Sequence, residues 1–174
     1  WGGVELARGD AQAALAHHRE ALAWLEARHG PAHVAVAEAA ANVGDMWMLL
    51  ADCEQARRSY GKALGIRADL AIEPDASLTR ILSGSARCSA AAGDIERAEE
   101  AASRVDELLA RGHGTTEFEG RVEMMRAEIA WQRGRHSTAR DHAEAAKRIW
   151  QRAGAAFRIQ IQDADRWLAA HSSM

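Results

Sequence analysis

The sequence predicts an all-α fold, a right-handed α-solenoid of antiparallel helical hairpins with a C-terminal capping helix. Three observations predict it. A short motif recurs at nearly constant spacing, alanine is abundant while β-branched and aromatic residues are scarce, and Pro31 and Pro74 are the only prolines. Alanine is the strongest helix former, and so few prolines leave long stretches in which a helix is not interrupted. A motif period of this length is typical of stacked helical pairs, each of which buries its apolar side against its neighbours.

The recurring motif has a small residue at a turn, a residue that can begin a helix, and an alanine five positions after the turn residue. The turn residues are Gly9, Ala51, Gly93 and Gly134, at intervals of 42, 42 and 41 residues. Asp10, Asp52 and Asp94 follow three of them, where an aspartate accepts hydrogen bonds from the free N–H groups of the next helix. The alanines are Ala14, Ala56, Ala98 and Ala139. We expect them one turn into each second helix, where a small side chain lets two helices approach closely.

The positions of the turn residues and capping aspartates predict where each helix begins and ends. The second helix of the first hairpin is expected at about 10–28, and the first helices of the later hairpins at about 32–50, 75–92 and 116–133. Pro31 and Pro74 stand before or at the first turns of two of them, where the missing N–H of proline leaves no hydrogen bond unmade. The prediction is a single domain over 1–174, with repeats over about 1–30 (incomplete), 31–72, 73–112 and 113–153.

The two ends of the chain differ from the middle. Residues 1–8 supply only a stub of a first helix, and the chain does not begin with methionine, so we expect a piece of a longer protein. At the other end, Phe157, Ile161, Ala164 and Leu168 form one apolar stripe beside Trp167. This stripe predicts an amphipathic helix over about 155–172 that caps the last hairpin.

The spacing and several residues resemble the tetratricopeptide repeat, in the longer form found in kinesin light chains. The second repeat carries the resemblance best, with Val43-Gly44 at the large–small pair of the first helix and Trp47 at its aromatic position. Tyr60 stands at the aromatic position of the second helix. In the third and fourth repeats these residues are replaced, and the turn spacing carries the resemblance. The resemblance implies first helices that line a concave face and a partner polypeptide bound along that face.

On the positions that correspond to the concave face, eight residues are candidates for binding a partner. They are Glu38, Asn42, Asp45, Arg80, Arg87, Arg121, Glu128 and Trp131. Arg80 and Arg87 lie seven residues apart, hence on one helix face, and Arg121 lies on the next first helix. Guanidinium groups placed in this way suit an acidic side chain or a C-terminal carboxylate, because each can donate two parallel hydrogen bonds.

Each of these candidates has a structural alternative. The arginines would instead face water, or pair with carboxylates of neighbouring helices, namely Glu38, Asp45 and Glu128. Trp131, with Met124 and Met125, would give the groove an apolar end, or the three side chains belong to the core.

Catalytic and metal chemistry find no support in the sequence. His29 and His33 have a spacing found in metal sites, but Gly30-Pro31 interrupts the helix that would align them, and no third ligand is evident. The chain has no glycine-rich phosphate loop, nucleophile elbow or catalytic carboxylate pair. Asp163-Asp165 and Glu99-Glu100 are expected to be ordinary solvated helix charges. We therefore predict no enzyme activity, no metal and no cofactor.

Composition and charge exclude several classes of protein and partner. With 48% hydrophobic residues the chain is not disordered, yet it has no apolar run long enough to span a membrane. The net charge of −3 gives no positive field for nucleic acid or an anionic membrane. Cys53 and Cys88 lie far apart in the sequence, and we expect reduced thiols in a cytoplasmic protein.

The function that these features favour is a protein–protein interaction module that binds a peptide or protein segment on its concave face. The alanine and arginine bias indicates a GC-rich bacterial source, and similar repeats accompany bacterial serine/threonine kinases and transcription regulators. We therefore expect a signalling or regulatory parent protein. Two alternatives remain: a homotypic dimerisation or scaffolding element that uses the N-terminal end and the apolar last helix, and a small-ligand sensor.

Overall fold

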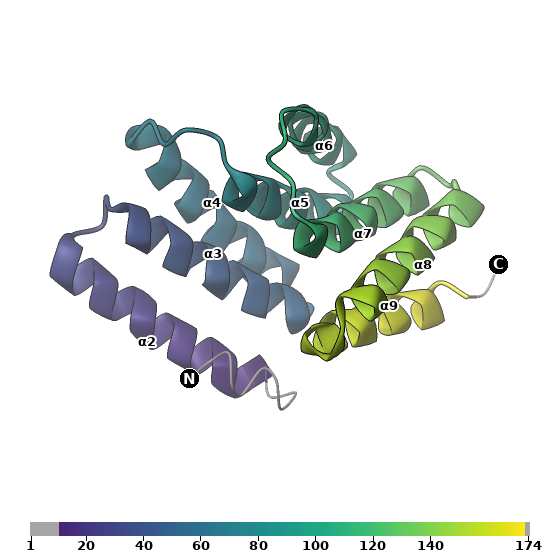
Figure 1. Cartoon of the computed structure of the whole chain (residues 1–174), viewed down its shortest axis with the longest axis horizontal. Helices are drawn as coiled ribbons and strands as arrows, with labels where there is room; N and C mark the ends of the chain where they lie inside the picture. The colour runs from purple at the N-terminus through teal and green to yellow at the C-terminus, as the bar shows by residue number, and fades with distance from the viewer. Residues whose placement is uncertain (1–10, 173–174) are drawn as a thin grey trace.

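The computed structural model describes residues 11–172, apart from the side chains of residues 116 and 117, and this part of the chain contains helices and no strand. The elements are α2 (Ala11–His29), α3 (Val34–Leu49), α4 (Cys53–Asp69), α5 (Ala76–Ala91), α6 (Ile95–Ala110), α7 (Thr116–Gln132), α8 (His136–Ala153), the 3-10 turn η1 (Ala155–Phe157) and α9 (Arg158–Ala170). The hairpins α3–α4, α5–α6 and α7–α8 follow one another in a stack (Figure 1). The predicted all-α solenoid of helical hairpins is confirmed, while the boundaries of the repeats stay a prediction.

The hairpin turns are built as the motif predicts. Ala51, Gly93 and Gly134 all have a left-handed backbone, with φ of 60°, 82° and 72°. Gly9 lies outside the described residues. Glycine adopts this conformation without steric cost, whereas a side chain at Cβ collides with the neighbouring carbonyl oxygen. Ala51 is therefore the strained member of the set.

Replacing this alanine with glycine should stabilise the fold. We expect Ala51→Gly to raise the free energy of unfolding by about 0.5–1 kcal/mol, because relief of the left-handed strain exceeds the added entropy of the unfolded chain. Ala23→Gly is the matched control, since Ala23 is exposed within α2. This change should cost about 1 kcal/mol. Urea unfolding measures both, and a loss of stability in both variants would contradict the turn assignment.

The aspartates of the motif cap the second helices. The Asp52 carboxylate accepts a hydrogen bond from the backbone N–H of Gln55 at 3.1 Å, and that of Asp94 accepts one from Arg97 at 3.4 Å. Each bond satisfies an N–H group that has no partner inside its helix. The caps at Asp52 and Asp94 are thus confirmed, and the one predicted at Asp10 lies outside the described residues.

Small residues stand where the helices cross. The motif alanines of the described turns and of α2 have no exposed surface: Ala14, Ala56, Ala98 and Ala139. Further along the second helices the same face is buried at Ala63, Val105 and Ala146. Ala21, at the corresponding place in α2, is exposed. α2 packs mainly on α3, and its Leu22 and Leu25 also join a cluster with Ile66 of α4. The side of α2 that carries Ala21 faces solvent.

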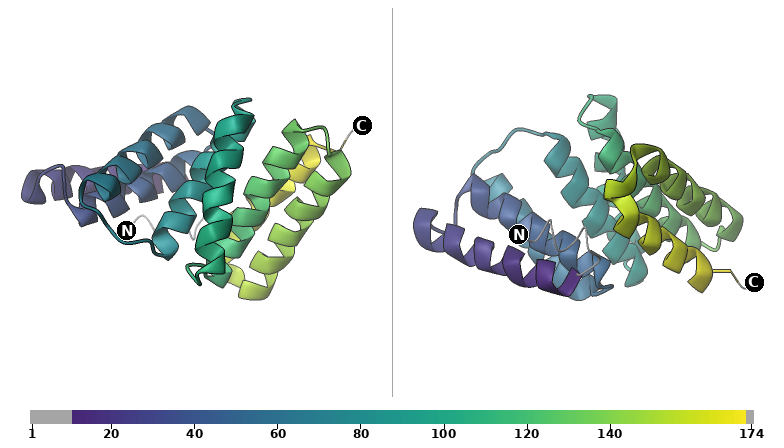
Figure 2. Two further views of the ribbon diagram at one scale, coloured as in Figure 1. Left: turned by 90° about the horizontal axis from the view of Figure 1, so that it is seen from above. Right: turned by 60° about the horizontal axis from the view of Figure 1, so that its bottom comes forward.

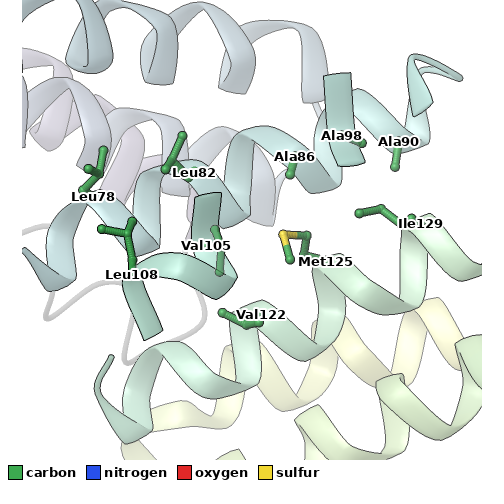
Figure 3. Close-up of a cluster of buried hydrophobic side chains, with 10 residues drawn as sticks. All are labelled: Leu78, Leu82, Ala86, Ala90, Ala98, Val105, Leu108, Val122, Met125 and Ile129. Atoms are coloured by element: carbon green, nitrogen blue, oxygen red, sulfur yellow. The ribbon is translucent and has the colours of Figure 1, made fainter. Parts of the chain in front are cut away.

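One of the main hydrophobic clusters joins α5, α6 and α7. Figure 3 shows Leu82 of α5, Val105 of α6 and Val122 of α7 directed toward a common interior. Met125 belongs to this cluster, and Met124 belongs to the adjoining cluster of α7, α8 and α9. Both methionines are buried, at 0% and 1% exposure. Of the two roles weighed for them, the core role is therefore confirmed.

The last helix closes the stack. The two views of Figure 2 show the hairpins passing from the α2–α4 layer to the α7–α9 end of the molecule. In α9, Ala164, Trp167 and Leu168 are buried against α7 and α8, so this helix caps the last hairpin as predicted. It also contacts α3, which is far from it in sequence.

The prediction of reduced thiols is wrong for this structure. Cys53 at the start of α4 and Cys88 near the end of α5 form a disulfide, with their Cα atoms 5.0 Å apart. The sequence separation of 35 residues concealed this pairing, because only the stacking of α4 on α5 brings the two ends together. Disulfides persist mainly in oxidising compartments, so the pair does not favour the cytoplasmic location that we expected. Within residues 11–172, no helix is both long and apolar enough to cross a membrane.

Candidate functional site

The first helices α3, α5 and α7 form the side of the stack that we call the inner face. The ring of Tyr60, from α4, organises the packing behind this face. This side chain has no exposed surface and lies between α3 and α5, where two glycines leave room for it. A Cβ atom at Gly44 would lie 2.7 Å from Tyr60 Cε1, and a Cβ atom at Gly84 would lie 2.6 Å from the Tyr60 hydroxyl oxygen. Glycine in a helix interior is unfavourable by itself, so its presence at both places indicates a close approach.

The hydroxyl of Tyr60 belongs to a buried hydrogen-bond network centred on the Asp45 carboxylate. It donates to Asp45 Oδ1 at 2.7 Å, Arg80 Nη1 donates to Oδ2 at 2.7 Å, and Arg121 Nη1 donates to Oδ1 at 2.8 Å. Burial alone would raise the pKa of the Asp45 carboxyl, but the charges of Arg121 and Arg80 outweigh it and leave the pKa below its ordinary value. Burial and the nearby Asp45 charge raise the pKa of Tyr60 well above its ordinary value, so the hydroxyl keeps its proton. One carboxylate thus joins α3 to α4, α5 and α7.

The network continues along the N-terminal part of the inner face. Arg80 also donates to Glu38 at 3.0 Å and to Asn42 at 3.2 Å. The buried guanidinium of Arg67 on α4 donates to Glu38 at 3.3 Å and to Asp75 at 2.9 Å. Buried charges are tolerated when they are paired and hydrogen-bonded. Both arginines are paired with carboxylates, although the Nε of Arg67 is buried without a hydrogen-bond partner.

The C-terminal part of the inner face is closed by α9. Asp163 of α9 pairs with Arg87 of α5 at 2.5 Å, and both side chains are about 15% exposed. Arg166 donates to the carbonyl oxygen of Leu49, at the end of α3, at 3.4 Å. Between α9 and the first helices there remains a cavity of about 30 Å³, lined by Arg121 and Trp150 among others. This cavity has room for about one water molecule and not for a polypeptide segment. A larger cleft of about 620 Å³ lies between the start of α2, the end of α3 and α9, and its lining includes Leu49, Ile159 and Arg166.

The comparison with protein families fits this architecture. A tetratricopeptide repeat model matches residues 1–69. The match supports a repeat protein of the tetratricopeptide type and covers α2, α3 and α4, including Gly44 and Tyr60 but not Gly84. No match was found among curated proteins. Tetratricopeptide repeats generally mediate protein–protein interaction.

The structure brings together five of the eight residues predicted to bind a partner. They are Glu38, Asn42, Asp45, Arg80 and Arg121. Asp45 and Arg80 are 6% and 7% exposed and bonded to each other, so here they join repeats, and partner binding by them stays a prediction. Arg80 and Arg121 pair with carboxylates of neighbouring helices, which is the structural alternative predicted for them from the sequence. Glu38, Asn42 and Arg121 are partly exposed, and partner binding by them stays a prediction.

The remaining three predicted residues lie against α9 and not in one groove. Arg87 is held by Asp163, which corrects the expectation that Asp163 is an ordinary solvated charge. Glu128 is buried and accepts a hydrogen bond from Trp167 Nε1 at 2.7 Å. The Trp131 ring packs edge to face on Trp167 at 5.9 Å. In this structure these side chains contact the capping helix, and partner binding by them stays a prediction.

The histidines do not assemble into a metal site. The rings of His29 and His33 stack at 4.5 Å across the turn between α2 and α3, and His33 Nδ1 caps α3 by accepting from the Ala35 N–H. In the described residues, no group of three or more His, Cys, Asp or Glu side chains is placed to hold a metal ion.

Open clefts lie on the outer side of the stack, between successive second helices. In Figure 1, α4 and α6 stand on either side of α5. The cleft between them has a volume of about 570 Å³, and we call it the basic cleft. Its lining includes Arg57, Arg58, Leu64, Ser85, Ala92 and Arg97. A second cleft of about 460 Å³ lies between α6 and α8, with α7 beneath it.

The sequence prediction missed the outer clefts. It followed the family resemblance to the first helices, whereas the basic cleft depends on how far apart two second helices stand. A signal was present in Arg57 and Arg97, which lie 40 residues apart and so at nearly the same place in successive repeats.

Proposed function

We propose that the chain is a protein-interaction module that binds polypeptide segments in the clefts between successive second helices. One observation carries the proposal: in a repeat stack of the tetratricopeptide type, ion pairs and α9 leave a cavity of only about 30 Å³ over the middle of the inner face, while clefts of several hundred Å³ lie between successive second helices. Ligand-binding clefts in proteins have volumes in this range.

The biological setting is part of the same proposal. The 42-residue spacing supports the kinesin-light-chain form of the repeat, and the composition supports a bacterial source. We propose a signalling or regulatory parent protein, such as a serine/threonine kinase or a transcription regulator, by analogy with proteins that carry similar repeats.

Peptide display tests the proposal with a matched pair of variants. The chain is immobilised and used to select binders from a library of short displayed peptides. Gly61 and Gly65 both lie on α4, and a Cβ atom at either would meet nothing within 4 Å, but only Gly61 lines the basic cleft. We expect Gly61→Trp to abolish binding of one set of selected peptides, because the indole fills the cleft, and Gly65→Trp to leave that binding unchanged.

Two results would contradict this proposal. One is a selection that enriches no peptide on the folded chain. The other is a set of binders that all tolerate Gly61→Trp and also tolerate a tryptophan at Ala102, which lines the second cleft.

Self-association is the second candidate function, and one feature favours it. Trp24, Val34 and Leu70 are large apolar side chains with exposures of 60%, 47% and 42%. They belong to the end of α2, the start of α3 and the end of α4, which meet at one edge of the stack (Figure 1). Exposed apolar patches mark contact sites in many soluble proteins. Sedimentation velocity over a wide concentration range decides the matter, since a monomer throughout removes this candidate.

A further inference from the structure

We infer that the basic cleft binds an acidic polypeptide segment, one that brings carboxylate side chains to arginines on both walls. The inference rests on the proposed function and adds the chemistry of the partner. Arg57 and Arg58 stand on the α4 wall and Arg97 stands on the α6 wall.

The charge of the cleft is opposite to that of the whole chain. Three arginines and one glutamate, Glu54, line it, while the protein carries a net charge of −3. The glutamate is already paired with Arg58. In the described part of the chain, the side chains of Arg57 and Arg97 make no hydrogen bond or ion pair. Two guanidinium groups at an open cleft, with no carboxylate of their own, are suited to a carboxylate from outside.

Part of the cleft lining is apolar. Leu64 of α4, Ala92 at the end of α5 and Cys53, one of the disulfide cysteines, line the cleft together with the arginines. Leu64 packs against two of the hydrophobic clusters, so its position is fixed by the core. A segment with an apolar side chain directed inward and carboxylates directed to either side would complement both surfaces.

The arginines of the inner face, and Arg126 at the second cleft, are less available because each is already paired. Arg80 and Arg121 of the inner face are bonded to Asp45, and Arg126 at the second cleft is paired with Asp106 and Glu123. A protein partner is favoured over nucleic acid, because no aromatic side chain that could stack on a base lines the basic cleft. The negative net charge also opposes a polyanionic backbone.

The test uses the full chain and two fluorescein-labelled synthetic peptides. One peptide contains glutamate and leucine residues, and the other has glutamine at every glutamate position. Fluorescence anisotropy measures their affinity for the wild type, for the cleft variant Arg57→Glu/Arg97→Glu, and for the control variant Arg104→Glu/Arg148→Glu. Arg104 and Arg148 are exposed helix residues that line neither outer cleft, so both variants change the net charge equally.

We expect the glutamate peptide to bind the wild type, and the cleft variant to bind it at least about tenfold more weakly. The control variant should stay within about twofold of the wild type. Equal loss in the two variants, or equal affinity for the glutamine peptide, would overturn the inference. A single-stranded oligonucleotide that displaces the peptide and binds more tightly would overturn it as well. Thermal unfolding of both variants checks that they fold.

The outcomes also separate the inference from the function on which it rests. Binders that are lost on Gly61→Trp but tolerate Arg57→Glu/Arg97→Glu would leave the module function standing and remove only the acidic partner. If no peptide binds any form of the chain, both proposals fail.

Discussion

An Asp45→Ala variant is expected to lose about 3–5 kcal/mol of unfolding free energy, because the change leaves buried charge without its counter-ion. Three donors meet at this carboxylate, from Tyr60, Arg80 and Arg121. Arg80 is 7% exposed, so water cannot replace the lost acceptor. Glu38 still pairs with Arg80 and limits the loss. Urea unfolding followed by far-ultraviolet circular dichroism measures the effect.

The matched control makes the same substitution in a surface ion pair. Asp106 bonds to Arg126 at 2.8 Å, and its side chain is 59% exposed. We expect Asp106→Ala to change the unfolding free energy by no more than about 0.5 kcal/mol, since solvent screens such pairs. If the two variants were equally stable, the Asp45 network would not be a principal link between repeats.

The same carboxyl makes the stability depend on pH. Its pKa in the folded chain lies below the ordinary value of 3.8, because the charges of Arg121 and Arg80 outweigh the opposing effect of burial. The ionised group therefore contributes its full stabilisation above pH 3.8, and that contribution is lost as the pH falls through the lowered pKa. The difference in stability between the wild type and Asp45→Asn should narrow over that acidic range.

Gly84→Ala is the second change with a large expected effect. Alanine within an exposed helix normally stabilises relative to glycine by about 0.5–1 kcal/mol. At this position the new methyl group would lie 2.6 Å from the Tyr60 hydroxyl oxygen and 2.7 Å from Cζ. Tyr60 has no exposed surface, and its hydroxyl is bonded to Asp45, so the ring cannot move aside freely. We expect a loss of about 1–3 kcal/mol in urea unfolding.

Gly65→Ala is the control for this prediction. Gly65 lies on the exposed side of α4, where a Cβ atom meets nothing within 4 Å, so alanine should stabilise there by about 0.5–1 kcal/mol. The two substitutions are thus expected to have opposite signs. In a Tyr60→Leu background the penalty of Gly84→Ala should shrink, because the smaller side chain leaves room for the methyl group. A penalty that stays the same would mean that the ring is not the obstacle.

Much of the fold followed from short stretches of sequence. The turns at Ala51, Gly93 and Gly134, and the caps at Asp52 and Asp94, depend on neighbouring residues. Backbone conformation and capping are local properties, which is why a single motif predicted them. The disulfide could not be predicted in this way, because its two cysteines belong to different hairpins.

The candidate site depended on contacts that no spacing rule supplies. Arg121 and Asp45 are 76 residues apart, and so are Arg87 and Asp163. The sequence assigned the predicted partner-binding residues to the correct helices. In the structure, however, most of them bond to one another or to α9. Whether a polar side chain meets a partner or its own chain depends on how tightly the stack curves.

The repeat period, turn residues and alanine pattern were therefore sufficient to specify a stack of helical hairpins, since these act over a few residues or one helix crossing. Only the packed structure decided that α9 covers the C-terminal part of the inner face and that an open cleft lies between α4 and α6. Small differences in packing at each repeat add up along a solenoid, and the final separation of distant helices is their sum.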